Sequence, residues 1–199
     1  MFRENIKSEE INMLERRNFE GEIIVVDTPH ALEAATKELQ RQSHIGFDTE
    51  GRPRFIKGSK RQIALLQFAT ATKAFLIRID ILGLEKSIIK IFENPAIIKI
   101  GLGLTDDMQT LRRLKRFEPA GFIDLQTYSK QFGIADNSLR KLTAITLGFR
   151  ISKSQRLSNW ENLEYTSAQK RYAATDAWVC LKIYQKLNQN NNDRFVNLN

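Results

Sequence analysis

The stretch HIGFDTEGRPRFIKGSKRQIALLQFATATKAFLIRI, residues 44–79, sets the expected fold. Its first seven residues predict a strand, and a polar loop punctuated by Gly and Pro follows them. Residues 62–70 and 73–79 are two further apolar runs, separated by Ala71 and Thr72, which predicts a hairpin. The stretch therefore predicts three strands, the last two of them antiparallel.

The chain before this stretch adds a strand and two helices. The β-branched run EIIVVD (22–27) is bounded by a Gly and by Thr-Pro, which predicts a buried strand. Residues 29–42 open with Pro29 at a first-turn position and repeat apolar residues at helical spacing. Residues 8–19 predict a short charged helix, so we interpret residues 1–20 as an N-terminal helical extension.

After the hairpin, helices and strands alternate again. The expected elements are a helix at 84–94, a strand at 96–103, a helix at 106–117, a short strand at 121–125, and mainly helix over 126–188 with a polar loop at 150–160. Strands that alternate with helices, together with one hairpin, predict an α/β fold with a mixed sheet and helices on both faces. We expect one domain over 21–188 and a polar, disordered tail over 189–199.

Composition excludes several classes of protein. A chain of 199 residues buries about 70% of its unfolded surface, so it needs no disulfide or structural metal to stay folded. Cys180 is the only cysteine, which excludes a disulfide framework and a zinc cluster. No apolar run approaches the roughly 20 residues of a membrane span, and the N-terminus lacks the apolar core of a signal peptide. We expect a soluble, cytoplasmic protein without a membrane partner.

The charge balance favours a polyanionic partner. Lys and Arg number 31 against 23 Asp and Glu, a net charge of +8. Such an excess attracts nucleic acid, although by itself it is equally well explained by a solvated surface.

Two acids stand near the end of the second predicted strand. Asp48 and Glu50 are two positions apart, so both side chains project from the same face. They repel each other and raise each other's pKa unless a cation lies between them, and Mg²⁺ or Mn²⁺ is the natural partner of an all-oxygen site. On this pair alone, a strand with both acids facing water is the favoured interpretation.

A second acidic pair lies in GLTDDMQTL (103–111). Asp106 and Asp107 follow a predicted strand and begin a helix, where an acid is ordinarily a cap or a dipole partner. One can fill that role while the other points across the sheet edge. These residues alone do not decide which.

The last helix carries an acid among small residues. In YTSAQKRYAATDAWVCLKIYQKL (165–187), Thr166 followed by Gln169 fits a capping box, which fixes the helix start. Tyr172 and Asp176 then stand at i and i+4 on one face. The alanines around them allow that face to approach the sheet closely, and burying an Asp there is costly unless it has a function.

Taken together, FDTE, GLTDD after a strand, and Tyr172 with Asp176 on a late helix resemble the DEDDy class of 3′–5′ exonucleases. The closest resemblance is to the ribonuclease D and Werner-syndrome exonuclease group. The stretches IALLQFAT, SLRKLTAITLG and KSQRLSNW, between the acids, support it. The resemblance covers about residues 21–187 and implies an RNase H-like fold.

The resemblance also implies a cofactor and a ligand set. The cofactor would be two divalent ions, Mg²⁺ or Mn²⁺. Asp48 would bridge both ions, Glu50 and Asp176 would complete the site on the nucleophile side, and Asp107 would act largely through water on the other ion. Asp107 is preferred to Asp106 because of its position relative to GLGL.

Tyr172 would orient the attacking water, since a phenol with a pKa near 10 is a poor base at neutral pH. The implied reaction releases nucleoside 5′-monophosphates from a nucleic acid with a 3′ end, DNA or RNA. Leu66 and Phe68 cannot face the side that Gln67 faces. Candidate substrate contacts, from family analogy and from charge, are Arg52, Arg54, Leu66, Gln67, Phe68 and Lys153.

Two other functions compete with the enzyme. A catalytically inactive nucleic-acid-binding module on the same fold would be expected to have lost one or more acids, and none is missing here. A metal-independent protein adaptor explains neither the four acids nor the basic loop.

Overall fold

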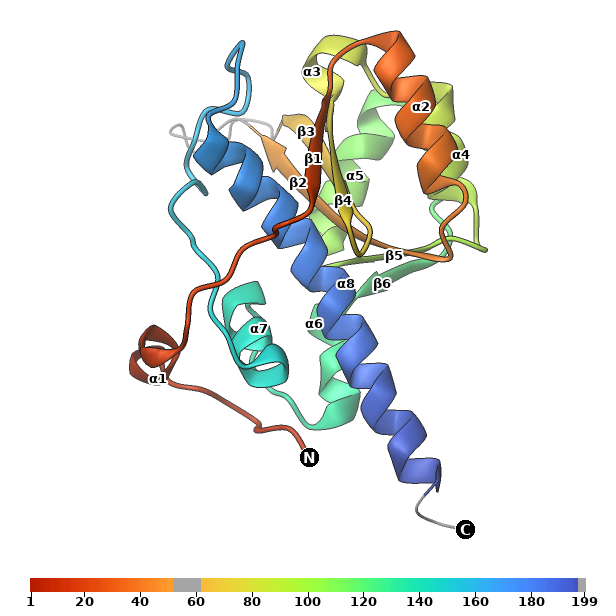
Figure 1. Ribbon diagram of the computed structural model, residues 1–199. Helices are drawn as coiled ribbons and strands as arrows, with labels where there is room; N and C mark the ends of the chain where they lie inside the picture. Colours follow the sequence, from red (N-terminus) through yellow and green to blue (C-terminus); the bar gives the residue numbers. More distant parts are fainter. Residues whose placement is uncertain (52–61, 197–199) are drawn as a thin grey trace.

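The computed structural model describes residues 1–51 and 62–196, with side chains through residue 189. Within these residues a six-stranded sheet with the order β1-β4-β3-β2-β5-β6 forms the centre (Figure 1). The strands pair in parallel except at β2–β3 and β3–β4, which are antiparallel. The bounds are β1 Glu22–Val26, β2 His44–Gly51, β3 Ile63–Ala69, β4 Lys73–Arg78, β5 Ile98–Gly101 and β6 Phe122–Asp124.

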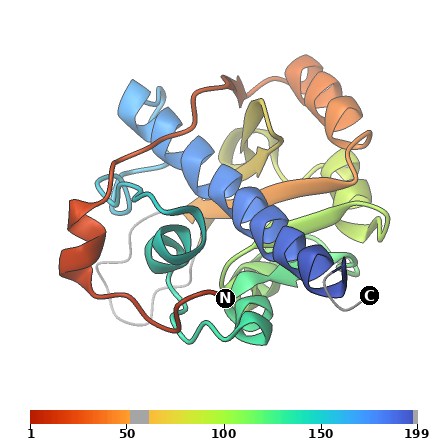
Figure 2. The ribbon, with the colours of Figure 1, turned by 60° about the horizontal axis from the view of Figure 1, so that its bottom comes forward.

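Helices cover both faces of this sheet (Figures 1 and 2). One apolar core packs α2, α4 and α5 against the sheet, and another packs α7 and α8 against it. The mixed sheet, the β3–β4 hairpin and the two helical layers confirm the predicted fold class. The helices are α1 Ser8–Met13, α2 Pro29–Leu39, α3 Ile79–Leu82, α4 Lys86–Glu93, α5 Leu104–Leu114, α6 Leu125–Tyr128, the 3-10 turn η1 Ser129–Phe132, α7 Leu139–Leu147 and α8 Ser167–Val196.

The approach of α8 to β2 depends on a glycine. A Cβ built at Gly46 would lie 1.8 Å from the carbonyl oxygen of Ala177. Phe47, the next residue, packs into the core on the opposite face, so the side chains of β2 alternate between the two helical layers. The predicted close approach of the alanine face of α8 is confirmed, and it brings Asp176 down to the sheet.

Three predicted elements differ from the structure. β1 is a half-buried edge strand instead of a buried one. The helix expected over 8–19 ends at Met13, because the following segment is extended and pairs with Arg150. The backbone of α8 continues to Val196, into the tail expected to be disordered.

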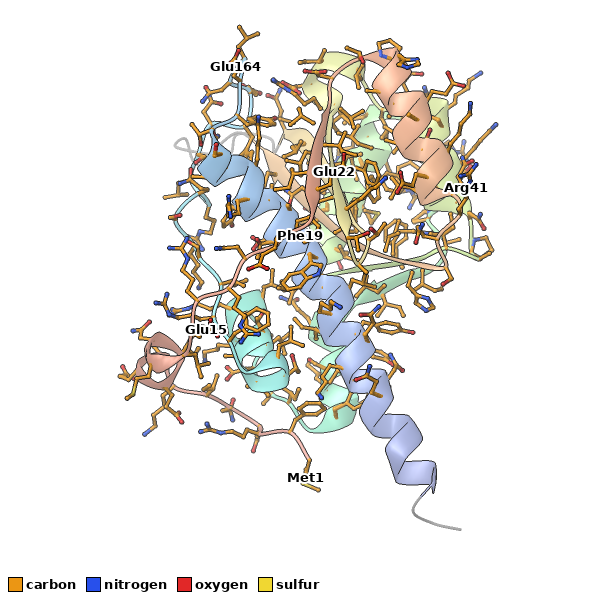
Figure 3. The ribbon with its side chains drawn as sticks, in the orientation of Figure 1. Met1, Glu15, Phe19, Glu22, Arg41 and Glu164 are labelled. Carbon is orange, nitrogen blue, oxygen red and sulfur yellow. The ribbon has the colours of Figure 1, made fainter. Side chains whose placement is uncertain are left out.

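The N-terminal segment packs on the helical layer of α7 and α8. Ile6 and Ile11 join a small apolar cluster with Ala144 of α7, and Phe19 is buried against α8. Figure 3 shows the path of this segment through Glu15 and Phe19 toward Glu22. In the described residues, no helix combines the length and the apolar character that a bilayer crossing requires.

Candidate active site

The first and last acids of the expected set come together at the interface of β2 and α8. Asp48 follows Gly46 by two positions and therefore projects from the same face of β2, toward α8. Asp176 lies on α8 one residue before Ala177, the residue that contacts Gly46. Both acids therefore lie at the contact of β2 with α8, and the negative charge of Asp48 raises the pKa of Asp176.

Asp176 is a buried acid. The residue is 7% exposed, and its Oδ1 atom has no hydrogen-bond partner within the described part of the chain. Burial is the main reason that its pKa is raised well above the usual value, followed by the charge of Asp48. The hydroxyl of Tyr172 and the charge of Lys153 act in the opposite direction and lower this pKa.

Tyr172 stands one turn before Asp176 on α8, as the spacing predicts. It is buried, and burial is the largest reason that the pKa of its hydroxyl is raised. The charges of Asp176, Glu50 and Asp48 raise this pKa further. Tyr172 therefore keeps its proton near neutral pH, which suits a hydrogen-bond donor better than a base. Its environment also places Glu50 on the same side of the sheet as the other two acids.

The second acidic pair separates into an exposed and a buried residue. α5 begins at Leu104, and this start exposes Asp106 and buries Asp107. The side-chain oxygens of Asp124 accept hydrogen bonds from the backbone N–H groups of Gly103 and Leu104, at 3.0 and 2.9 Å, and so fix the start of the helix. Asp107, the residue chosen from the resemblance, is therefore the one that points into the protein.

The three candidate substrate contacts on β3, Leu66, Gln67 and Phe68, do not share one face of the sheet. Gln67 pairs across the sheet with Asp48, so its side chain lies on the face of the acids. Leu66 and Phe68 are fully buried in the core on the other face. They cannot reach a substrate at the acids in this arrangement, which follows from the alternation of side chains along β3.

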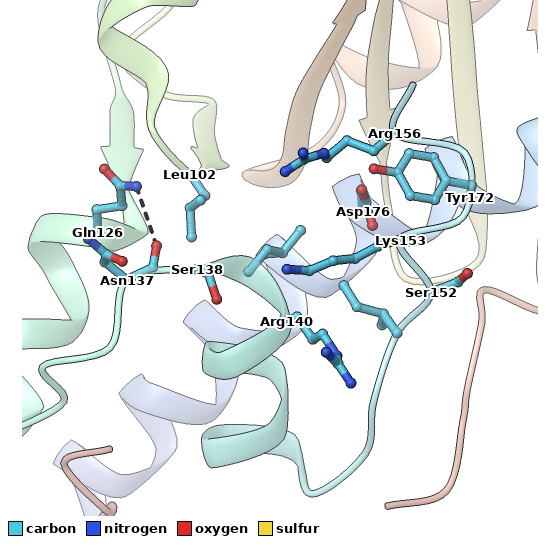
Figure 4. Close-up of a pocket in the computed structure, with 12 residues that line it drawn as sticks. Leu102, Gln126, Asn137, Ser138, Arg140, Ser152, Lys153, Arg156, Tyr172 and Asp176 are labelled. Atoms are coloured by element: carbon cyan, nitrogen blue, oxygen red, sulfur yellow. Dashed lines mark hydrogen bonds between the residues drawn. The ribbon is translucent and has the colours of Figure 1, made fainter. Parts of the chain in front are cut away.

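A cavity of about 310 Å³ opens beside Tyr172 and Asp176 (Figure 4). Lys153 and Arg156, from the segment that precedes α8, point into it together with the Tyr172 hydroxyl. Gln126 and Arg140 line its other side. The cavity therefore has carboxylate and phenol groups at one end and cationic groups around it. Lys153, one of the candidate substrate contacts, lines this cavity, while Arg52 and Arg54 lie outside the described residues.

A chain of aromatic contacts that the sequence did not predict supports Tyr172. The ring of Trp160 lies 6.1 Å from that of Tyr172 and 5.5 Å from that of Tyr165, centroid to centroid. Arg78 lies over the Tyr165 ring, pairs with Asp80 at 2.7 Å and donates a hydrogen bond to the Leu163 carbonyl at 2.7 Å. These contacts fix the segment before α8 to β4. The one feature of the sequence that could have indicated them is Arg78, a charged residue at the end of an apolar strand.

The chemistry of these residues fits a hard divalent cation, but in the described part of the chain they do not form a complete metal-binding site. The donors are carboxylate oxygens, which Mg²⁺ and Mn²⁺ prefer, and the unpartnered Oδ1 of Asp176 is available as a ligand. In the described part of the chain, no three His, Cys, Asp or Glu side chains are arranged closely enough to hold a metal ion.

Comparison with known proteins identifies the family. A family model described as 3′–5′ exonuclease matches residues 23–191. The chain belongs to this 3′–5′ exonuclease family. Exonucleases of this family generally use divalent metal ions.

Individual exonucleases of the family agree with this assignment. The bifunctional 3′–5′ exonuclease/ATP-dependent helicase WRN of Mus musculus is 34% identical over 149 residues, covering 72% of this chain and 11% of the relative. The chain thus spans a small part of that protein.

Two solved structures show the same fold. The Nibbler EXO domain of Aedes aegypti aligns with a TM-score of 0.78 at 23% identity, over 87% of this chain and 91% of that one. The RNase D of Trypanosoma brucei, in its complex with RNA U12, aligns with a TM-score of 0.76 at 19% identity, over 85% and 63% of the two chains. The RNase H-like fold expected from the sequence is confirmed.

Proposed function

We propose that this chain hydrolyses the terminal phosphodiester bond at the 3′ end of a nucleic acid and releases nucleoside 5′-monophosphates. The observation that carries the proposal is the meeting of Asp48 on β2 with Asp176 and Tyr172 on α8, at a cavity that Lys153 and Arg156 also line. Both the resemblance and the family membership point to the same reaction.

The metal ligands in this proposal are Asp48, Glu50, Asp107 and Asp176. Two divalent ions, Mg²⁺ or Mn²⁺, supply an activated water and stabilise the charge on the leaving 3′ oxygen when they are bound. The burial of Asp176, whose Oδ1 atom has no hydrogen-bond partner in the described part of the chain, supports it as a ligand, because a buried carboxylate without a cation is costly.

The other residues bind and orient the substrate. Tyr172 holds its proton and donates a hydrogen bond to the attacking water, which it positions against the phosphorus atom. Lys153 and Arg156 neutralise the phosphate that enters the cavity. Their flexible side chains carry no base-reading geometry, so we expect little sequence preference.

Both RNA and DNA remain candidate substrates. The Trypanosoma brucei relative is an RNase D seen with RNA, which makes RNA the first substrate to test. The 2′-hydroxyl is the group that distinguishes the two polymers, and its recognition depends on the geometry of the loaded site.

Digestion of a 5′-labelled single strand tests the proposal. RNA and DNA of one sequence are incubated with Mg²⁺, with Mn²⁺ or with EDTA, beside the Asp48→Ala and Asp176→Ala proteins. We expect a ladder that shortens from the 3′ end, requires a metal and is absent in both variants. Binding of the strand without a ladder under either metal would instead establish the inactive nucleic-acid-binding module.

A further inference from the structure

A second cavity lies next to the candidate active site. It has a volume of about 240 Å³, and Ser152 and Tyr172 line both it and the first cavity. Lys153 lines the first cavity and Ser154 the second, so the short segment 152–154 separates the two. The second cavity is therefore adjacent to the proposed reaction centre, because Tyr172 lines both cavities.

The N-terminal segment builds one wall of this second cavity. Arg16 and Asn18 line it, and both precede residues 23–191, the part that matches the family model. Arg150 fixes this segment in three ways: its N–H donates to the Glu15 carbonyl at 2.9 Å, its Nε donates to the Leu14 carbonyl at 2.9 Å, and its carbonyl accepts from the Arg17 N–H at 3.0 Å.

A fourth bond anchors the segment to α8. The backbone N–H of Phe19 donates to the hydroxyl of Thr175 at 2.9 Å, and the Phe19 ring is buried. Arg16 therefore lies between backbone groups that are bonded to Arg150, three residues before the α8 anchor at Phe19, and its side chain is exposed.

The opposite wall of the cavity also carries a cation. Arg171 lies on α8 one position before Tyr172 and is exposed. Hydroxyl groups complete the lining, since Ser152, Ser154 and Ser167 all face the cavity. Two guanidinium groups with hydroxyl donors between them are the groups that bind a phosphate.

The two arginines are available for an anion. Across residues 1–51 and 62–189, other exposed arginines such as Arg3, Arg17 and Arg112 pair with a glutamate. Neither Arg16 nor Arg171 has an ion pair or a side-chain hydrogen bond in that part of the chain. Neither guanidinium charge is therefore neutralised by an ion pair of its own in the described part of the chain.

We propose that the second cavity binds a backbone phosphate of the nucleic-acid strand whose 3′ end occupies the first cavity. The inference rests on the proposed function. Arg16 and Arg171 would clamp the phosphate, and the strand would cross the 152–154 segment beside Tyr172. The groups that line the cavity face a phosphate and not a base edge, so this contact adds affinity without sequence preference.

Fluorescence anisotropy of a 5′-labelled, 12-nucleotide single strand of RNA, with EDTA present to prevent hydrolysis, tests the inference. The Arg16→Ala/Arg171→Ala protein is compared with the Arg41→Ala/Arg113→Ala protein. The control removes the same charge from exposed arginines of the described chain that line neither cavity, and Arg41 lies across the molecule from Glu15 (Figure 3).

We expect about tenfold weaker binding for the Arg16/Arg171 variant at moderate salt, and a slope of log K against log salt that is smaller by about 0.7, the value for one lost phosphate contact to a single strand. The control variant should bind within about twofold of wild type. Equal thermal midpoints for the two variants show that both are folded.

Equal affinity of the two double variants would overturn the inference, even if the wild-type protein digests 3′ ends. Weaker binding by the Arg16/Arg171 variant alone, in a protein that digests no strand, would support the cavity and contradict only the proposed hydrolysis. The two proposals therefore fail in different ways.

Discussion

Asp48 on β2 and Asp176 on the last helix are separated by most of the chain, yet the charge of the first raises the pKa of the second. Their meeting depends on Gly46, which has no Cβ and lets the backbone of Ala177 approach the strand. The candidate site is therefore a product of how closely α8 packs on the sheet.

Removing the charge of Asp176 should stabilise the metal-free protein. Asp176→Asn ends a repulsion between the buried Asp176 carboxylate and Asp48 at nearly constant volume, so we expect the free energy of unfolding to rise by at least about 1 kcal/mol. Thermal denaturation in EDTA measures this change. In wild type, Mn²⁺ should raise the midpoint by mass action, and in the variant this shift should vanish. An unchanged Mn²⁺ shift in the variant would rule out Asp176 as a ligand.

Loss of the Tyr172 hydroxyl should reduce the rate without unfolding the protein. Tyr172→Phe keeps the ring that packs on Trp160 and removes only the donor, so we expect digestion to slow by about 100-fold. Tyr128→Phe is the matched control, because that hydroxyl donates to Asn188 at 2.8 Å and does not line the cavity. Equal rates for both variants in a digestion time course would contradict a role for Tyr172.

The buried amide of Gln67 should lower the free energy of unfolding. Gln67 is fully buried, and neither its nitrogen nor its oxygen has a hydrogen-bond partner among the described residues. Gln67→Met is close in shape and apolar, so we expect the free energy of unfolding to rise by about 1 kcal/mol. Urea denaturation measures it.

Gln169 provides the opposite case for this experiment. It is also buried, but its side chain accepts a hydrogen bond from the Thr166 N–H at 3.0 Å and donates one to the Asn159 carbonyl at 3.2 Å. Gln169→Met should therefore destabilise the protein. If both substitutions lower stability by similar amounts, the Gln67 amide has partners in solution.

Lys99 should make stability depend on pH. Its side chain is buried under α4 and donates to the carbonyls of Asn94 and Ile97 at 2.8 and 2.7 Å. Burial lowers its pKa to about 8. Between about pH 8 and 10.5 the unfolded chain holds a proton at this residue that the folded chain has lost, so stability rises with pH across that interval, by at most about 1.4 kcal/mol per pH unit.

The Lys99→Met protein tests this dependence. Other groups titrate in the same interval, so the informative quantity is the difference in slope between the two proteins. We expect the free energy of unfolding of the variant to rise less between pH 8 and 10 than that of wild type. Parallel curves would show that Lys99 keeps an ordinary pKa in the folded protein.

Local patterns predicted most of the fold. The hairpin at Ala71 and Thr72 and the capping box of Thr166 with Gln169 both depend on neighbouring residues, and both are present. The prediction of a helix over 8–19 was wrong beyond Met13, because Arg150, far along the chain, binds the residues that follow.

The site was predictable only in part. The sequence could not choose between Asp106 and Asp107, because the phase of α5 depends on its start, which Asp124 caps from a different strand. The alternation along β3 predicts that Leu66 and Phe68 lie on the face opposite to Gln67, but β3 alone does not indicate which of its two faces carries the acids. Arg16 lines the second cavity because its segment binds Arg150, far along the chain, and a local sequence pattern cannot predict such a long-range contact.

Titration calorimetry with Mn²⁺ tests the central claim, that acids from β2, α5 and α8 hold the metal. Asp106→Ala and Asp107→Ala form a matched pair of adjacent substitutions, one exposed and one buried. We predict wild-type binding in Asp106→Ala, weakened binding in Asp107→Ala, and loss of binding in Asp48→Ala and Asp176→Ala. Binding of Mn²⁺ by the last two proteins as by wild type would contradict the claim.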